Sequence, residues 1–199
     1  MINHKRTERI YREEGLMLRR KRRRKGAAGL RVTMPVPKKP NEHWSMDFVT
    51  DSIVTGRRFR ALAIIDDFSR ECPVIEVDTS LGGARVVSVL DRLAETRGLP
   101  EVITMDNGPE FAGKTLDEWA YRKGVKLNFI RPGKPIENAY AESFNSRFRD
   151  ECLNTNWFMS LRHARDIIEY WRRDYNEVRP HSSLNNRTPG EYALTTVGL

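Results

Sequence analysis

The sequence has no long apolar run and only two cysteines. No stretch approaches the ~18 uninterrupted apolar residues of a membrane-spanning helix, and the N-terminal residues lack the apolar segment of a signal peptide. Cys72 and Cys152 exclude a disulfide framework and are too few for a cysteine-rich zinc site. We therefore expect a cytoplasmic protein, without a membrane segment, in which both thiols are reduced packing residues.

Excess positive charge is absent from most of the chain and concentrated at its N-terminus. Residues 1–40 hold 14 Lys or Arg against three Glu, whereas the other 159 residues hold 21 basic and 24 acidic side chains. The densest basic run consists of Arg19, Arg20, Lys21, Arg22, Arg23, Arg24 and Lys25. Such a run predicts phosphate binding through counterion release, without base specificity. A solvated tail or a localisation-like patch is the alternative interpretation.

The N-terminal residues are expected to form an arm separate from the main domain. Residues 4–19 have the pattern of a short helix with too few apolar positions to bury a core of their own. The stretch KGAAGLRVTMPVPKKPN follows, in which the residues before each proline are held extended. We predict a basic arm and linker over residues 1–39 and one main domain over residues 40–199.

The main domain has an α/β pattern. Three segments of strand length, WSMDFVTD, RFRALAIIDDFS and PVIEVDTS, predict an antiparallel meander. A helix (ARVVSVLDRLAETRG), a strand (EVITMD), a helix (LDEWAYRKG) and a strand (VKLNFI) follow, then helices over about 137–153 and 161–177. Helices between strands favour right-handed crossovers and parallel pairing. The order βββαβαβα is typical of a ribonuclease H-like α/β fold with a mixed five-stranded sheet flanked by helices.

Three carboxylates occupy positions that make them candidates for a catalytic or metal-binding role. Asp47 lies mid-strand among apolar neighbours, Asp106 ends the fourth predicted strand before an Asn-Gly turn, and Glu142 lies within a helix. Three polar residues at i−4, i+3 and i+7 share the helical stripe of Glu142: Asn138, Asn145 and Arg149. Taken singly, each acid has an ordinary explanation as a surface strand residue, a turn-initiating Asp or part of a solvent-facing stripe.

Together with their surroundings, these acids resemble a known family. Thirty-five residues separate Asp106 from Glu142, and four blocks occur in order: HWSMDFVTD, MDNGPEF, ENAYAESFNSRFRDECLN and DYNEVRPHSSLNNRTPGEY. The chain resembles the integrase-core transposases of bacterial insertion sequences, the type encoded by the second reading frame (orfB), and more distantly the retroviral integrases. The resemblance implies a DDE-type polynucleotidyl transferase that cleaves DNA and transfers strands in transposition and integration.

The resemblance also implies a metal centre. Asp47, Asp106 and Glu142 correspond to the family's catalytic acidic triad, which would hold two Mg²⁺ or Mn²⁺ ions. Hard carboxylate oxygens are the ligands that these ions prefer, and two ions about 3.5–4 Å apart serve an in-line displacement at phosphorus. No small-molecule substrate is expected.

The expected partner is DNA, both transposon ends and target, bound by a homo-oligomer in the nucleoid. Arg149 takes the family's basic position seven residues beyond the catalytic Glu, and Lys134 is a second candidate for phosphate contact. Asn138 and Asn145 are expected to order metal-bound water or the DNA backbone.

Other residues have weaker or structural assignments. Asn107 and Gly108 are expected to shape the turn that presents Asp106, whereas Asp66 and Asp67 are interpreted as structural residues at a strand end. His181 matches a family position whose function the sequence does not reveal. Three tryptophans are expected to pack in or against the core: Trp119, Trp157 and Trp171.

Two competing functions remain open from the sequence. Family members begin with a helix-turn-helix region, of which HKRTERIYREEGLMLRRKRRRK resembles only the last helix and basic exit. A truncated, non-catalytic DNA-binding remnant that interferes with full-length transposase is therefore the alternative to an enzyme. A ribonuclease H-type or retroviral-like nuclease is a third interpretation, and its retroviral form is disfavoured because two cysteines 80 positions apart do not provide a His/Cys zinc module.

Overall fold

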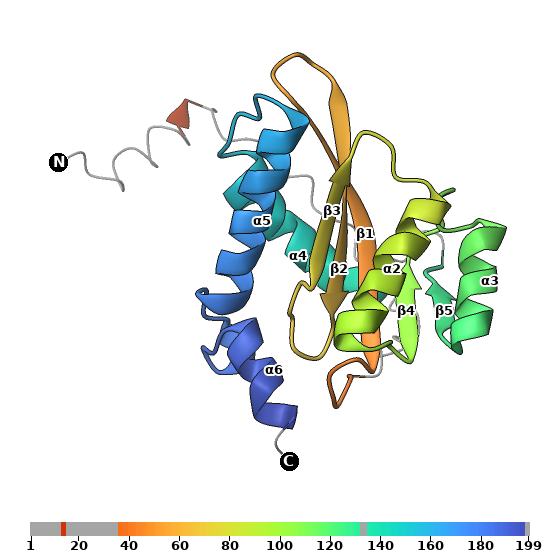
Figure 1. Cartoon of the computed structure of the whole chain (residues 1–199). Coiled ribbons are helices and arrows are strands. Elements are labelled where there is room, and N and C mark those ends of the chain that lie inside the picture. Colours follow the sequence, from red (N-terminus) through yellow and green to blue (C-terminus); the bar gives the residue numbers. More distant parts are fainter. Residues whose placement is uncertain (1–12, 15–35, 132–134, 198–199) are drawn as a thin grey trace. The chain divides into compact units, whose positions relative to one another are not determined.

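The computed structural model describes residues 13–14, 36–131 and 135–197 (Figure 1). The chain divides into two compact units, Met1–Met34 and Pro35–Leu199. The predicted N-terminal helix, apart from residues 13 and 14, lies outside the described residues, as do the basic run 19–25 and Lys134. The following description therefore concerns the second unit.

A mixed five-stranded sheet forms the centre of this unit, in the order β3-β2-β1-β4-β5. The first three strands form an antiparallel meander, and β4 and β5 extend the sheet in parallel on the other side of β1. The strands are β1 (His43–Ser52), β2 (Arg58–Asp66), β3 (Val74–Asp78), β4 (Val102–Met105) and β5 (Lys126–Phe129). The predicted meander, parallel crossovers and ribonuclease H-like arrangement are confirmed.

Helices cover both faces of the sheet (Figure 1). They are α2 (Gly83–Arg97), α3 (Lys114–Lys123), α4 (Ala139–Phe148) and α5 (Leu161–Glu177). Side chains of β2 alternate between the two cores, because successive strand residues point to opposite faces. Ala61, Ala63 and Ile65 pack in the cluster that includes α4 and α5, whereas Leu62 and Ile64 pack with α2 and α3.

The helix predicted over about 137–153 is divided into three segments. A 3-10 turn (η1, Pro135–Asn138) precedes α4, and a π-helical turn (η2, Arg149–Leu153) follows it. Cys152 and Leu153 are both buried at the end of this turn. The burial of Cys152, together with that of Cys72, confirms the expectation of free packing thiols.

The C-terminal family block, DYNEVRPHSSLNNRTPGEY, packs against the loop between β2 and β3. Asn176 of α5 accepts a hydrogen bond from the Cys72 backbone N–H (2.9 Å) and donates one to the Cys72 carbonyl (2.8 Å). A Cβ added at Gly190 would lie 3.1 Å from the Asn176 carbonyl oxygen, so α6 (Pro189–Val197) approaches α5 closely at this point. Sequence reasoning did not single out Asn176, because no periodic pattern distinguishes a buried clamp from an exposed amide.

A capping box starts α6. Glu191 accepts from the Thr188 N–H (3.0 Å) through its side chain and donates its own N–H to the Thr188 hydroxyl (3.2 Å). The Thr-Pro-Gly-Glu sequence carries this signal, with Pro189 at the first helical position. The block therefore has a structural explanation at this helix start.

The tryptophan predictions are correct for two of the three residues. Trp119 is fully buried and Trp171 packs against the core, but Trp157 is 83% exposed. Trp157 lies in the turn between η2 and α5, where its neighbour Phe158 points into the core instead. No helix in the described part of the chain is long and apolar enough to cross a membrane.

Replacing Asn176 with Ala should destabilise the domain. The variant leaves the buried Cys72 N–H without its acceptor, which costs about 1–3 kcal/mol of unfolding free energy. Urea denaturation measures the loss, with Asn154→Ala as control, because Asn154 is exposed and its replacement should change stability by less than about 0.5 kcal/mol. Equal midpoints for the two variants would show that the clamp contributes nothing.

Candidate active site

Asp47 lies on β1, and Asp106 directly follows the adjacent parallel strand β4. The β1–β4 pairing matches His43 with Val102, Trp44 with Ile103 and Ser45 with Thr104, a constant offset of 59 positions. The same offset, continued two residues past the last pair, places Asp106 level with Asp47. The register of the sheet therefore brings together two acids that are far apart in the sequence.

The Asp47 carboxylate is half-buried and held on both oxygens. The Phe48 N–H donates to Oδ1 (2.8 Å) and the Asn145 side-chain amide of α4 donates to Oδ2 (2.8 Å). Burial raises the pKa of Asp47 above the ordinary value of 3.8, and the negative charges of Asp106 and Glu142 raise it further, against the lowering effect of the two hydrogen bonds. The charges of both other predicted acids, Asp106 and Glu142, therefore act on the Asp47 carboxylate.

A tight turn after β4 orients Asp106. The Gly108 N–H donates to Asp106 Oδ1 at 2.9 Å, and a Cβ at Gly108 would lie 2.9 Å from that oxygen and 3.2 Å from Glu110 Oε2. The Asn107 side chain donates to the Ile130 carbonyl (2.7 Å), which ties the turn to the end of β5. Both residues shape the turn as expected, and a side chain at position 108 would displace the carboxylate.

The polar stripe of Glu142 on helix α4 faces strand β1. Asn138 is 2% exposed and its amide lies 3.5 Å from the Met46 carbonyl, while Asn145 bonds to Asp47. Glu142, between them on the stripe, is exposed, as is Arg149 at the end of the helix. The asparagine side chains of the stripe therefore pack against β1, whereas its charged side chains are exposed to solvent. The alternative of a stripe that faces solvent along its whole length does not fit this arrangement.

The acids together offer oxygen ligands and uncompensated charge. None of Asp47, Asp106 and Glu142 forms an ion pair within the described residues. The side-chain oxygens of Asn138 and Asn145 are buried there without a hydrogen-bond donor. In the part of the chain that the structure describes, no three His, Cys, Asp or Glu side chains are grouped closely enough to hold a metal ion. Exposed Glu142 is the acid whose side chain is least constrained by packing.

Asp66 and Asp67 have a different environment, which supports their structural interpretation. Asp66 is fully buried and accepts backbone N–H groups of Phe68 (3.0 Å) and Ser69 (3.1 Å). Asp67 accepts from the Ser45 hydroxyl (2.9 Å) and contacts a ring nitrogen of His43. Burial raises the pKa of Asp67, and the His43 contact opposes this effect. These bonds fix the turn after β2.

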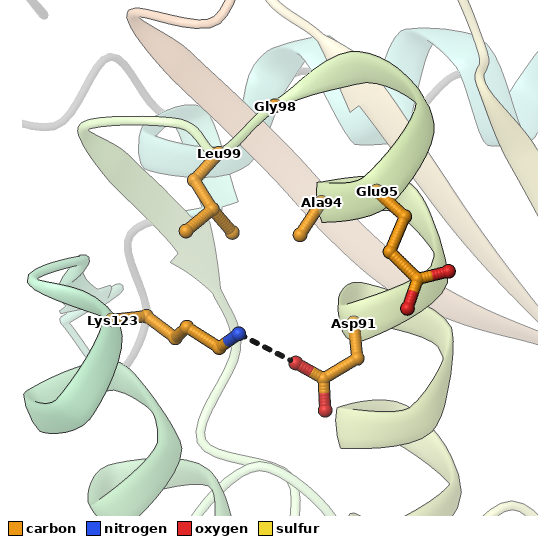
Figure 2. Close-up of a pocket in the computed structure, with 6 residues that line it drawn as sticks. All are labelled: Asp91, Ala94, Glu95, Gly98, Leu99 and Lys123. Atoms are coloured by element: carbon orange, nitrogen blue, oxygen red, sulfur yellow. Dashed lines mark ion pairs between the residues drawn. The ribbon is translucent and has the colours of Figure 1, made fainter.

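A separate hollow lies between α2 and α3. It has a volume of about 570 Å³, and Figure 2 shows the ion pair across it, in which Lys123 Nζ lies 3.3 Å from Asp91 Oδ1. The Trp119 indole also donates to Asp91 (2.9 Å). None of the residues predicted to act on DNA lines this hollow, so it is distinct from the acidic site.

The fold is that of an integrase catalytic core. A chain of a simian T-cell lymphotropic virus intasome, in a complex with PP2A regulatory subunit B56 gamma, aligns with TM-score 0.67 and 17% identity over 78% of this chain and 55% of that one. The HTLV-2 integrase catalytic core domain in complex with magnesium (trimeric form) aligns with TM-score 0.59 and 15% identity, covering 78% of this chain and 97% of that one.

The sequence places the chain more narrowly. Two models described as integrase core domain match residues 37–135 and 123–189. An uncharacterized 31.7 kDa protein of insertion element IS407 from Burkholderia multivorans is 52% identical over 96% of this chain and 69% of its own length. The IS476 39.2 kDa protein of Xanthomonas euvesicatoria is 46% identical, over 96% of this chain and 56% of its own length.

A more distant relative of the chain is named as a transposase. The putative transposase InsD of insertion element IS2E from Escherichia coli is 27% identical over 96% of this chain and 91% of its own length. The chain belongs to the integrase-core transposases of bacterial insertion elements, a family of polynucleotidyl transferases in DNA transposition and integration.

Removing the charge of Asp106 should lower the pKa of Asp47. Asp106→Asn keeps the acceptor oxygen for Gly108 while removing one of the two charges that raise the Asp47 pKa. Carboxyl ¹³C NMR titration measures the change, with the exposed Asp117→Asn in α3 as control.

Stability should follow the same coupling. Because its folded-state pKa is raised, Asp47 binds its proton more tightly in the folded protein than in the unfolded chain. Its contribution to stability therefore falls as the pH rises from about 3.8 through the raised pKa. Asp106→Asn should relieve part of that loss at pH 7, and the relief should fade as the pH falls toward 3.8. An unchanged Asp47 pKa would show that the two carboxylates do not interact.

Proposed function

We propose that this chain is the catalytic core of a DDE-type strand transferase, in which Asp47, Asp106 and Glu142 hold two Mg²⁺ or Mn²⁺ ions. The observation that carries the proposal is geometric: the β1–β4 register sets Asp106 level with Asp47, and Asn145, on the same stripe of α4 as Glu142, donates to Asp47. None of the three acids has a cationic partner among the described residues, and the charges of Asp106 and Glu142 both contribute to the raised pKa of Asp47. Carboxylates without a cationic partner are the oxygen ligands that hard divalent cations prefer, and in this proposal the side chain of exposed Glu142 moves toward the two aspartates when metal binds. A structural neighbour of the chain was determined in complex with magnesium.

The chain's own residues position the acids for this chemistry. Asn145 orients one oxygen of Asp47, the Gly108 N–H orients Asp106, and Asn138 anchors the start of α4 to β1 beside Glu142. When bound, paired divalent ions activate an attacking oxygen and stabilise a leaving oxygen at phosphorus. Water would attack in cleavage and a DNA 3′-hydroxyl in joining. No protein nucleophile is then required.

The substrate in this proposal is DNA, with transposon ends and target brought together by a homo-oligomer in the nucleoid. Supporting this, relatives of the chain are named as insertion-element transposases, and a structural neighbour belongs to an intasome. Arg149 is exposed on the helix of the proposed catalytic Glu and has no ion-pair partner among the described residues, so it is available to a phosphate. Lys134 is assigned the same contact.

Glu142→Gln tests the enzyme against a DNA-binding remnant. The substitution keeps the side-chain volume and a similar helix propensity but removes the charge of a proposed metal ligand. Mg²⁺-dependent nicking and strand transfer should fall at least about 100-fold, or roughly 2.7 kcal/mol of transition-state stabilisation, with folding and DNA affinity retained. Mg²⁺ should also raise the melting temperature of the parent more than that of the variant.

Glu118→Gln is the matched control for Glu142→Gln. Glu118 is an exposed acid on α3, away from the three carboxylates, so its replacement should leave nicking and the response to Mg²⁺ unchanged. Nicking that persists in Glu142→Gln at the parental rate, with an equal Mg²⁺ response, would contradict the metal assignment. A parent without metal-dependent nicking would favour the DNA-binding remnant.

The basic N-terminal unit is proposed to bind DNA without sequence preference. Residues 1–34 hold 12 Lys or Arg, and this unit is separate from the unit that contains the sheet. Deleting it should flatten the dependence of log Kd on log salt concentration, because each phosphate neutralised contributes about 0.9 to that slope. The melting temperature should change little. A large fall in thermal stability would show that the segment packs as part of the core.

A further inference from the structure

A second polar pocket lies beside α4, on a different side of the helix from the stripe of Glu142. It has a volume of about 310 Å³ and is bounded by the start of α4, the end of α5, the loop after α5 and the turn after β2. Its polar lining comprises Arg70, Tyr140, Ser143, Arg147, Tyr175, His181, Ser182 and Ser183. All these side chains are able to donate hydrogen bonds, and no carboxylate lines the pocket.

His181 contributes an unused donor. His181 is only 3% exposed, and its ring packs edge-on against that of Tyr175, with 4.7 Å between the ring centroids. An Arg147 guanidinium nitrogen lies 3.2 Å from His181 Nδ1. Because a guanidinium only donates, Nδ1 is the acceptor and the neutral ring carries its proton on Nε2. Nε2 has no hydrogen-bond partner among the described residues.

The protonation state of His181 agrees with this geometry. Burial, together with the positive charges of Arg147, Arg179 and Arg70, lowers the pKa of His181 to about 4. The imidazole is therefore neutral at pH 7, and its Nε2–H remains a donor without an acceptor. An unpaired buried N–H costs about 1–3 kcal/mol, which a bound acceptor would recover.

The two arginines of the pocket also lack direct ion-pair partners among the described residues. Arg70 and Arg147 are half-buried, and neither forms an ion pair within the described residues. By contrast, the half-buried Arg97 and Arg172 pair with carboxylates. Arg179, whose charge also reaches His181, is paired with Glu151.

Contacts within the protein hold Arg70 in place. Its guanidinium stacks over the Tyr140 ring at 3.9 Å and donates to the Asp67 carbonyl. The backbone of Arg70 has a positive φ of 63°, a conformation that costs energy in a non-glycine residue. The guanidinium is therefore held in place without a direct ion pair, although the charge of Asp67 acts on it from a longer distance.

We propose that this pocket binds a backbone phosphate of DNA. Two unpaired guanidinium groups, a buried imidazole N–H and serine hydroxyls match an anion with several acceptor oxygens, the chemistry of a phosphodiester. Ser143 and Arg147 of the pocket are on the same helix as Glu142, so one duplex that contacts both sides of α4 would engage the pocket and the acidic site together. The inference rests on the proposed DNA substrate and adds a positioning site that the acidic triad does not provide.

The direct test follows the His181 imidazole by ¹⁵N NMR in the full chain. Without ligand, the spectrum should show the Nε2–H tautomer at pH 7. A short DNA duplex without added metal should shift the His181 Nε2 resonance and leave that of half-buried His163, which is at the start of α5 and does not line the pocket, in place. Inorganic phosphate should compete at higher concentration. Resonances of His181 that DNA does not move would overturn the proposal.

Substitutions test the contribution to DNA affinity. Arg147→Gln should weaken metal-free DNA binding by about tenfold and reduce the salt slope by about one. Arg173→Gln removes the same charge from an exposed arginine on α5 that pairs with Glu169, and should change affinity less than twofold. Equal losses for the two variants would mean that only net charge matters and would overturn the site.

A surface variant guards against failure to fold. Ser183→Glu places a negative charge at the exposed rim of the pocket without removing a buried group, and Ser146→Glu places the same charge on an exposed position of α4 that does not line the pocket. Only Ser183→Glu should abolish the His181 shift. Competition by polyglutamate stronger than by DNA would overturn the DNA assignment in favour of an acidic protein segment.

These measurements need neither metal nor turnover, so they are separable from the test of the proposed catalytic function. Loss of the His181 response with intact nicking would reject the phosphate pocket alone. A retained response without metal-dependent nicking would reject the catalytic proposal alone and leave a DNA-binding protein that uses this pocket.

Discussion

The parallel pairing of β1 with β4 is the constraint on which the rest of the site depends. Its register sets Asp106, at the end of β4, level with Asp47 on β1, and the charge of Asp106 adds to the effect of burial in raising the pKa of Asp47. A shift of one residue would turn one carboxylate to the opposite face of the sheet. The antiparallel meander and the crossover through α2 hold that register, because both cores bury side chains of β1.

Docking of α4 adds the third acid, and asparagines make the contact with the sheet. Asn145 donates to Asp47 and Asn138 lies against the Met46 carbonyl, so the helix is fixed to β1 by amides on the stripe of Glu142. Amides carry no charge, and they therefore leave the negative potential of the carboxylates uncompensated. The cost of such clustered charge is consistent with a site arranged for function, since natural proteins tolerate local electrostatic conflict mainly where it serves a ligand.

Positive charge in this chain occurs in two different arrangements. The N-terminal residues carry a dense basic run suited to any polyanion, whereas Arg70 and Arg147 are single charges held in place around a buried imidazole. The first arrangement supplies affinity that salt screens, and the second supplies geometry. In the proposed function, the basic run would supply affinity for DNA and the pocket would orient it over the acidic site.

The sequence by itself determined the order of strands and helices, the mixed sheet, and the three acids with their spacing, because periodic patterns and family blocks are local properties of the chain. Gly108 and Asn107 were also predictable, since an Asn-Gly turn after a strand has few conformations. Only the tertiary structure decided that Asn176 clamps Cys72, that Trp157 is exposed beside buried Phe158, and that His181 meets Arg147. Each of these depends on which segments become neighbours after folding. Burial and hydrogen-bond partners are properties of that neighbourhood, and no single segment of the sequence contains them.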